Sequence, residues 1–134
     1  MQLAIPRPQS DQELYEYVLN TLGVLLPRTA VKPGHRAPFE AFADAYFARY
    51  PVCVWLGARG LAGKTFMLAT LGFTEGVTLR ANVSILGGSG DQSEKVLEYL
   101  TDFWHRENAP KAALESDPAA RRVKLVWGNR IRAL

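Results

Sequence analysis

The sequence has few of the side chains that form disulfides or hold metal ions. In 134 residues it has one cysteine, Cys53, and two histidines, His35 and His105. A single cysteine rules out an internal disulfide and is typical of a reducing compartment. Because Cys53 lies in a short apolar run, we expect an inert thiol inside a buried strand. Neither histidine has a cysteine or an acidic cluster at ligand spacing, which argues against a zinc site.

Long hydrophobic runs are missing as well. No apolar stretch reaches the length of a membrane span, and the amino-terminal residues do not show the pattern of a signal peptide. We therefore expect no membrane partner and a cytoplasmic location. Hydrophobic residues make up 48% and charged residues 22% of the chain, which is typical of a folded domain with its own core. The net charge of +3 permits an acidic partner without requiring one.

One stretch combines a short apolar run, a glycine-rich turn and the start of an apolar helix. Residues 52–65 read V-C-V-W-L-G-A-R-G-L-A-G-K-T. A strand, a glycine-rich loop and a helix that opens with Gly-Lys-Thr are typical of a phosphate-binding loop, in which backbone N–H groups and the helix dipole stabilise an anion. In such a loop the Lys64 ammonium reaches the β- and γ-phosphates, and the Thr65 hydroxyl binds Mg²⁺. The residues predicted to surround the nucleotide are Gly57, Ala58, Gly60, Leu61, Ala62, Gly63, Lys64 and Thr65.

The match to this pattern has one departure. In the strict pattern four residues separate the first glycine from Gly-Lys-Thr, whereas this chain has Ala58 at the position of that glycine and Gly57 one position earlier. Alanine costs little where the backbone φ angle is negative and is strained where φ must be positive. The alternative, a glycine-rich turn that happens to precede a helix, stays open.

The spacing of apolar residues predicts an α/β fold. Ser10 and Glu13 form a capping box at the start of the first helix, and Gly76 is a plausible C-cap of the third. The order of helices and strands predicts a mostly parallel sheet with right-handed crossovers and flanking helices. Residues 1–32 are predicted as a helix and linker, and residues 33–134 as the nucleotide-binding unit. The predicted helices are 10–22, 38–50, 63–75 and 91–104, and the predicted strands are 52–57, 80–86, 123–127 and 130–134, the last two joined by a Gly-Asn hairpin turn.

Four segments occur in an order that resembles a known family. They are P-G-H-R-A-P-F at 33–39, G-A-R-G-L-A-G-K-T at 57–65, I-L-G-G-S-G-D-Q-S at 85–93 and W-G-N-R-I at 127–131. Together they resemble the amino-terminal ATPase domain of the large terminase subunit of tailed bacteriophages. The resemblance covers 33–134 and implies a P-loop NTPase-like fold with ATP and Mg²⁺ as cofactors. In the whole family protein, which is also a nuclease, ATP hydrolysis drives double-stranded DNA into the capsid. The resemblance also implies a homo-oligomer that works in the host cytoplasm with the terminase small subunit and the portal protein.

The resemblance also implies roles for single residues. Lys64 and Thr65 match the family's phosphate-binding lysine and magnesium-binding hydroxyl. Arg59 resembles the arginine of this turn that stabilises charge on the transferred phosphoryl group, although it lies one position further from the lysine than usual. Arg36, with His35 and Phe39, lies where the family contacts adenine. The alternative is an arginine on a solvated turn and an aromatic side chain in the core.

No apolar strand after Lys64 ends in acidic residues. The run at 83–86 continues into two glycines, and the run at 123–127 continues into Gly-Asn. Hydrolysis requires an aspartate that holds Mg²⁺ and a residue that orients the attacking water. We therefore expect this chain alone to hydrolyse ATP negligibly.

In the family pattern the acidic strand would follow residue 134. We interpret the chain as part of an ATPase domain that is incomplete at its carboxyl end, before the metal-binding strand. Two other readings stay open: a different P-loop NTPase such as a helicase, and a non-catalytic nucleotide-binding module.

Basic residues cluster near the carboxyl end and are candidates for contact with DNA phosphates. A solvated hairpin face is the alternative. The cluster consists of Arg121, Arg122, Lys124, Arg130 and Arg132.

Overall fold

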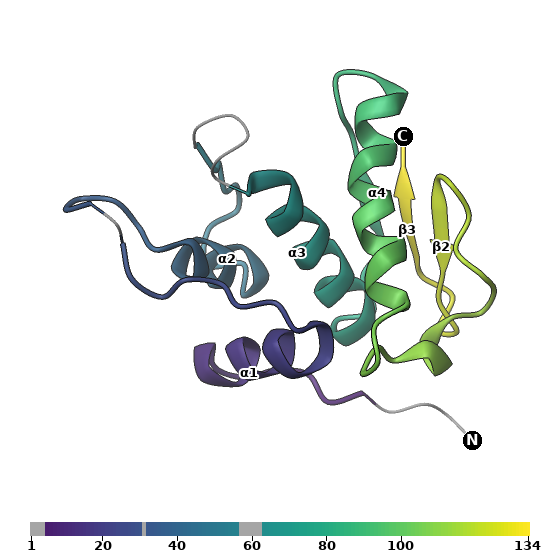
Figure 1. The fold of residues 1–134 in the computed structure, drawn as a ribbon, viewed down its shortest axis with the longest axis horizontal. Helices are drawn as coiled ribbons and strands as arrows, with labels where there is room; N and C mark the ends of the chain where they lie inside the picture. Colours follow the sequence, from purple (N-terminus) through teal and green to yellow (C-terminus); the bar gives the residue numbers. More distant parts are fainter. Residues whose placement is uncertain (1–4, 31, 57–62) are drawn as a thin grey trace.

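The computed structural model describes residues 5–30, 32–56 and 63–134 of the chain. This part of the chain is an α/β structure in which four α-helices accompany a small three-stranded sheet (Figure 1). In chain order its elements are α1 (Asp11–Leu22), α2 (Pro38–Tyr46), α3 (Lys64–Thr78), β1 (Val83–Ile85), α4 (Gly90–Trp104), the 3-10 helix η1 (Lys111–Ala113), β2 (Arg122–Lys124) and β3 (Arg130–Ala133).

Local capping signals account for where the helices begin. The Ser10 hydroxyl accepts a hydrogen bond from the Glu13 backbone N–H at 3.2 Å, and this confirms the predicted start of α1. Ser89 caps α4 in the same way through the N–H of Gln92, at 3.3 Å. Pro38 occupies the first turn of α2, where its missing N–H costs nothing. The four predicted helices are present, although α2 ends at Tyr46 rather than at residue 50.

The prediction that Gly76 ends the third helix is wrong. Helix α3 continues to Thr78, and Gly76 lies inside it against the hairpin strand β3. A Cβ atom at this position would lie 2.7 Å from Cδ1 of Ile131, so glycine permits the close approach of β3. The side-chain amide of Asn129 donates hydrogen bonds to the carbonyls of Gly76 and Ala81 at 2.9 and 2.8 Å. The hairpin is thereby anchored to the end of α3.

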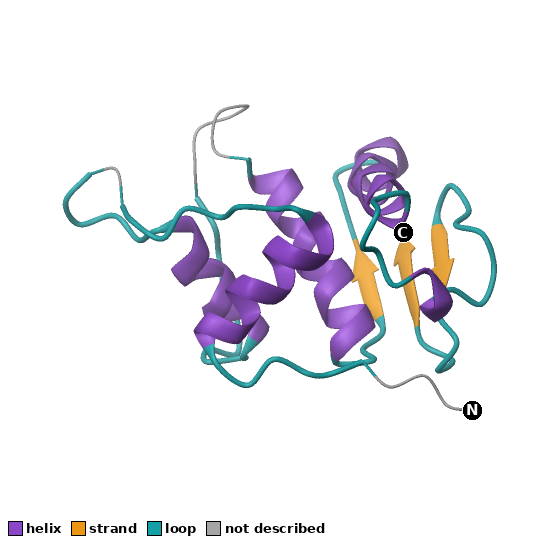
Figure 2. Cartoon of the chain, turned by 60° about the horizontal axis from the view of Figure 1, so that its bottom comes forward, coloured by secondary structure: helices purple, strands orange, loops and turns teal. Residues whose placement is uncertain are grey.

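The sheet is mixed rather than mostly parallel. Its strand order is β1-β3-β2, with β1 parallel to β3 and β2 antiparallel to β3 (Figure 2). The hairpin prediction is confirmed, but residues 125–129 form a wider connection than the two-residue turn expected, closed by the bond from the Gly128 N–H to the Leu125 carbonyl at 3.0 Å. The fold class is therefore α/β as predicted, with one parallel and one antiparallel pair of strands.

The predicted strand at 52–57 is wrong for residues 52–56, and residue 57 lies outside the described residues. No strand is present at 52–56. The Val54 and Leu56 side chains are 84% and 99% exposed, and Cys53 is exposed rather than a buried thiol. A strand is stabilised by pairing with a neighbour, and no described strand lies beside this segment. Its apolar sequence alone is not enough to make it a strand.

The core lies where α3 and α4 pack against each other and against one face of the sheet. The Phe73 ring of α3 contacts the rings of Phe103 and Trp104, with centroid distances of 5.9 and 4.6 Å. Helix α1 adds its apolar stripe to the same cluster, and α2 is joined to α3 by the hydrogen bond between the Tyr46 and Thr78 hydroxyls at 2.6 Å. Three aromatic residues of α2, Phe39, Phe42 and Tyr46, belong to this core, whereas Tyr50, after the end of α2, is 56% exposed.

The helices of the described part are short. The longest of them, α3 and α4, have 15 residues each. No helix in the described ranges has both the length and the apolar character to cross a membrane. A membrane-spanning helix is therefore not seen in these ranges.

Glu75, near the carboxyl end of α3, makes the stability of the fold depend on pH. Burial raises its pKa from 4.5 to about 7, so the folded chain holds a proton that the unfolded chain has already released. The free energy of unfolding should therefore fall as the pH rises from about 4.5 to 7, and the full cost of the buried carboxylate should persist above that range. One pKa unit corresponds to about 1.4 kcal/mol, and because Glu75 is partly solvated we expect Glu75→Gln to stabilise the fold by only about 1–2 kcal/mol near pH 8.

Urea unfolding at about pH 5 and about pH 8 measures this effect. We expect the gain from Glu75→Gln to be much smaller at the lower pH. Glu107→Gln, at an exposed position after α4, is the matched control. It should change the free energy of unfolding little, and by the same amount at both pH values. If Glu75→Gln raised the free energy of unfolding by the same amount at both pH values, the raised pKa of Glu75 would be contradicted.

Candidate functional site

Helix α3 begins at the residues predicted to bind phosphate. Gly63 precedes the helix and has φ 62° and ψ 26°, a left-handed conformation that glycine adopts more readily than other residues. Lys64 and Thr65 are the first two residues of α3. The first backbone N–H groups of a helix have no partner within the helix. Gly63 has no side chain that could accept from them. The start of α3 therefore has no side-chain cap and carries a lysine.

The electrostatics of α3 differ from those of the other helices in the described part. The first turns of α1, α2 and α4 each contain at least one acidic residue, which offsets the positive end of the helix dipole. The first turn of α3 contains none. Lys64 adds a positive charge at the same end. Both contributions would stabilise an anion at this position.

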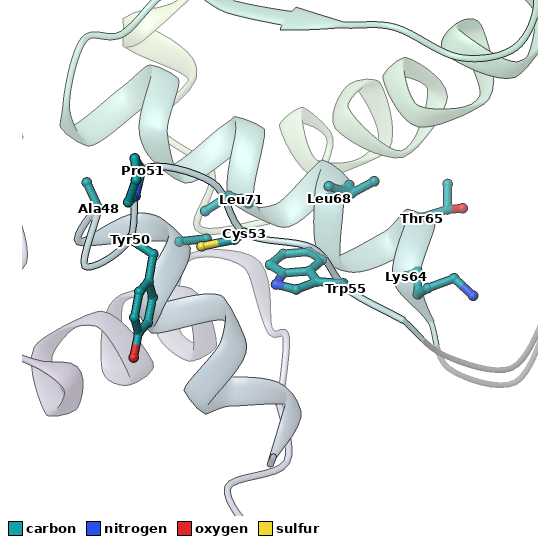
Figure 3. A pocket seen from close by; sticks show the side chains of 10 residues that line it. Ala48, Tyr50, Pro51, Cys53, Trp55, Lys64, Thr65, Leu68 and Leu71 are labelled. Atoms are coloured by element: carbon teal, nitrogen blue, oxygen red, sulfur yellow. The ribbon is translucent and has the colours of Figure 1, made fainter. Parts of the chain in front are cut away.

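Two cavities adjoin the start of α3, and both are lined by Lys64 and Trp55. The first has a volume of about 510 Å³ and is also lined by Thr65, Cys53 and Leu68. Figure 3 shows the Trp55 indole beside the first turns of α3, between Cys53 and Lys64. The second, also of about 510 Å³, is lined in addition by Met67 and by residues of α2 and of the segment before it. The exposed segment 52–56 thus forms a wall of the site instead of a strand.

The segment before α2 brings His35 and Arg36 to the second cavity. Arg36 is at the same time held by acidic residues of α2: its Nη2 lies 2.5 Å from Oδ2 of Asp44, and its Nε lies 3.8 Å from Oε2 of Glu40. Its side chain remains 57% exposed. The structure therefore brings Arg36 and Lys64 to one cavity, and Arg36 also contributes to the ion pairs of α2. Its contact with adenine stays a prediction.

Phe39 belongs to the core, which was the alternative to a contact with adenine. Its side chain is 5% exposed and packs edge-on against Tyr15, with a centroid distance of 5.3 Å. It lines neither cavity. Of the three residues of this segment with a predicted role, only His35 and Arg36 reach the site.

Thr65 also lines a third cavity of about 400 Å³, which lies between α3 and α4. That cavity has Lys95, Glu98 and Asp102 of α4 in its lining. No group of three or more histidine, cysteine, aspartate or glutamate side chains that could hold a metal occurs among the described residues. The hydroxyl of Thr65 as a magnesium ligand stays a prediction.

Six of the predicted site residues lie outside the described residues. They are Gly57, Ala58, Arg59, Gly60, Leu61 and Ala62, so their roles stay predictions. Sequence reasoning missed Trp55, which lines both cavities beside Lys64. Its position just before the glycine-rich turn was visible in the sequence, but it was assigned to the interior of a strand.

The chain was compared with protein-family models, with curated proteins and with solved structures, and none of the three comparisons gives a match. An argument about function therefore depends on the motif in the sequence and on the geometry around Lys64.

Proposed function

We propose that this chain binds ATP with Mg²⁺ at the start of α3, as the nucleotide-binding part of a phage DNA-packaging terminase large subunit. One observation carries the proposal. Lys64 and Thr65 open a helix with no side-chain cap and no acidic residue in its first turn, and this helix adjoins two cavities. Phosphate binding at such a helix start is widespread among nucleotide-binding proteins.

The donor set at this position fits a magnesium triphosphate. Backbone N–H groups of the first turn and the Lys64 ammonium are donors suited to phosphate oxygens. Mg²⁺ prefers oxygen ligands and is commonly held by one or two protein oxygens together with the phosphates of the nucleotide. The Thr65 hydroxyl would supply such an oxygen. When bound, Mg²⁺ would supply charge neutralisation between the β- and γ-phosphates.

The second cavity is the proposed place for the base. Its volume of about 510 Å³ lies within the range usual for small-ligand sites. The Trp55 indole is a flat apolar surface on which a base can stack, and His35 and Arg36 supply polar groups to the lining of the same cavity. With the phosphates at Lys64, both parts of the nucleotide would be contacted by residues of one site.

The terminase assignment rests on the four segments that resemble that family. Double-stranded DNA, the small subunit, the portal protein and a homo-oligomeric state come from this resemblance and are proposals with it. The W-G-N-R-I segment has a structural function that is compatible with the assignment, because its Asn129 ties the hairpin to the helix that begins at Lys64.

A non-catalytic nucleotide-binding module is the second candidate, and the end of β1 favours it. In a hydrolysing enzyme of this class a strand delivers a carboxylate to the metal. Here Leu86 follows β1, and Gly87 and Gly88 come next; their N–H groups donate hydrogen bonds of 2.7 Å to the side chains of Ser93 and Gln92. This turn is closed on α4 and offers no acidic side chain to the site.

Thermal unfolding with ATP, with and without Mg²⁺, tests binding, and phosphate release tests hydrolysis. A ligand present at about one hundred times its dissociation constant stabilises the folded state by about 2.7 kcal/mol, so a clear rise in melting temperature with Mg²⁺ and ATP is expected. Phosphate release should stay at the level of a sample without protein. An unchanged melting temperature at millimolar ATP would contradict binding. Turnover that disappears in Lys64→Ala would contradict the non-catalytic expectation.

A further inference from the structure

The solvent-facing side of the sheet carries basic residues in register. Arg122 of β2 lies directly opposite Arg132 of β3, and Lys124 lies directly opposite Arg130. Residues opposite each other in an antiparallel pair have Cβ atoms about 4.5–5.5 Å apart. Two like-charged pairs therefore lie side by side on the same two strands.

These four side chains lie on the face of the sheet that the helices leave open. Successive residues of a strand point to opposite faces, and Val123 and Ile131 between them are fully buried on the helix side. Arg122, Arg130 and Arg132 are exposed, and Lys124 is half-buried. Ser84 of β1, opposite Arg132, continues the same face with a neutral polar side chain.

One negative charge adjoins this face: Glu115, whose N–H donates to the Lys124 carbonyl at 3.0 Å, lies opposite Lys124 on the other side of β2. Like charges directly opposite in a sheet are destabilising. Among the residues that the structure describes, none of the four basic side chains forms an ion pair with a carboxylate, whereas the neighbouring Arg121 is paired with Glu94 of α4 at 2.6 Å. The chain therefore keeps an arrangement that costs stability.

We propose that this face, defined by Arg122, Lys124, Arg130 and Arg132 and called the basic sheet face, binds the phosphate backbone of duplex DNA. Four cations on a flat surface complement a dense row of phosphates, and their mutual repulsion is relieved when an anion lies over them. The three strands contain no aromatic residue, so this face has no platform for stacking the bases of a single strand. Contact with the backbone alone positions a duplex without reading its sequence.

The inference depends on the charge register of the sheet and not on the nucleotide site. The basic sheet face is formed by strands, whereas the start of α3 is formed by a helix and the segment before it. Lys64→Ala should therefore leave DNA affinity unchanged. A failure of the DNA-binding proposal can then be distinguished from a failure of the nucleotide-binding proposal.

Fluorescence anisotropy with a labelled duplex of about 20 base pairs, over roughly 50 to 200 mM salt, is the test. Each phosphate contact contributes about −0.9 to the slope of log K against log salt, so four contacts predict a slope of about −3 to −4. Arg130→Gln with Arg132→Gln removes one member of each like-charged pair. We expect this double variant to lose about 10- to 100-fold in affinity and about two units of slope.

A second double variant, Arg122→Gln with Lys124→Gln, removes the opposite members and should give the same loss. Lys95→Gln with Lys111→Gln is the control of equal net charge, since both residues are exposed and lie outside the strands. Neither double variant of the face should have a lower melting temperature, because like-charge repulsion is removed. An equal loss in the control would overturn the proposal, because it would assign binding to net charge. The proposal would also be overturned if the chain bound single-stranded DNA or polyglutamate more tightly than it binds the duplex.

Discussion

Lys64→Ala is expected to weaken binding of ATP with Mg²⁺ by about 10- to 100-fold. A hydrogen bond to a charged group contributes about 1.5–3 kcal/mol, and Lys64 is the cation that the start of α3 places beside both cavities. The remaining backbone donors of the first turn would keep weak affinity for phosphate. Calorimetric titration with ATP measures the loss directly.

Three controls separate a lost contact from a lost fold. Lys111→Ala removes an exposed lysine of η1, remote from α3 in sequence, and should leave ATP affinity unchanged. Lys64→Arg keeps the charge and should retain more affinity than Lys64→Ala. Thr65→Ala should reduce the gain in affinity that Mg²⁺ gives, with little effect on metal-free binding. If Lys64→Ala and Lys111→Ala bind ATP equally well, the phosphate site is not at the start of α3.

Asn129→Ala is expected to lower the free energy of unfolding by about 2–4 kcal/mol. The Asn129 side chain is 6% exposed, and its amide bonds two backbone carbonyls, those of Gly76 and Ala81. Each buried polar group left without a partner costs about 1–3 kcal/mol. The variant leaves both carbonyls without this donor and loosens the hairpin from α3. Urea unfolding followed by circular dichroism measures the change.

Asn108 provides the matched control for this prediction. Its amide also bonds a backbone carbonyl, that of Asn20, at 3.1 Å, but the bond is exposed and water can replace it. Asn108→Ala should therefore cost less than about 1 kcal/mol. Asn129→Asp should be at least as destabilising as Asn129→Ala near neutral pH, because a carboxylate cannot donate to the two carbonyls. Equal effects of Asn129→Ala and Asn108→Ala would show that the hairpin anchor contributes little.

The helices could be predicted from the sequence because their signals are local. Ser10 and Ser89 cap the helices that follow them, and Pro38 starts another, so no distant residue has to be known. The hairpin was predicted for the same reason, since Gly128, at φ 93°, takes a conformation that glycine favours. The wider turn depends on Asn129, whose side chain is directed to α3, and that contact is long-range.

The strands were harder to predict because each depends on a partner distant in sequence. The apolar run at 52–56 has the composition of a buried strand, but pairing decides whether it becomes one. The same holds for Gly76, which was read as a helix end from its type and is instead a point of contact with Ile131. Residue type gave the local preference in both cases, and tertiary contacts overrode it.

The candidate site was predictable in part. The motif placed Lys64 and Thr65 at the start of a helix, and the structure has them there. The segment with His35 and Arg36 was linked to them by resemblance, and both reach a cavity that Lys64 lines. Trp55 was missed because a residue assigned to a strand interior has no reason to face a ligand. Its place in the site follows from the absence of a pairing partner for residues 52–56 among the described strands.

The most direct test of the central claim is a titration of ¹⁵N-labelled chain with ATP and Mg²⁺, followed by NMR. If the first turn of α3 holds the triphosphate, the largest shifts will be those of the backbone amides of Lys64, Thr65 and Phe66 and of the Trp55 indole N–H. Lys64→Ala should make the shifts of Thr65, Phe66 and Trp55 much smaller at the same ATP concentration. Shifts confined to the basic sheet face, or no shifts at millimolar ATP, would contradict the account.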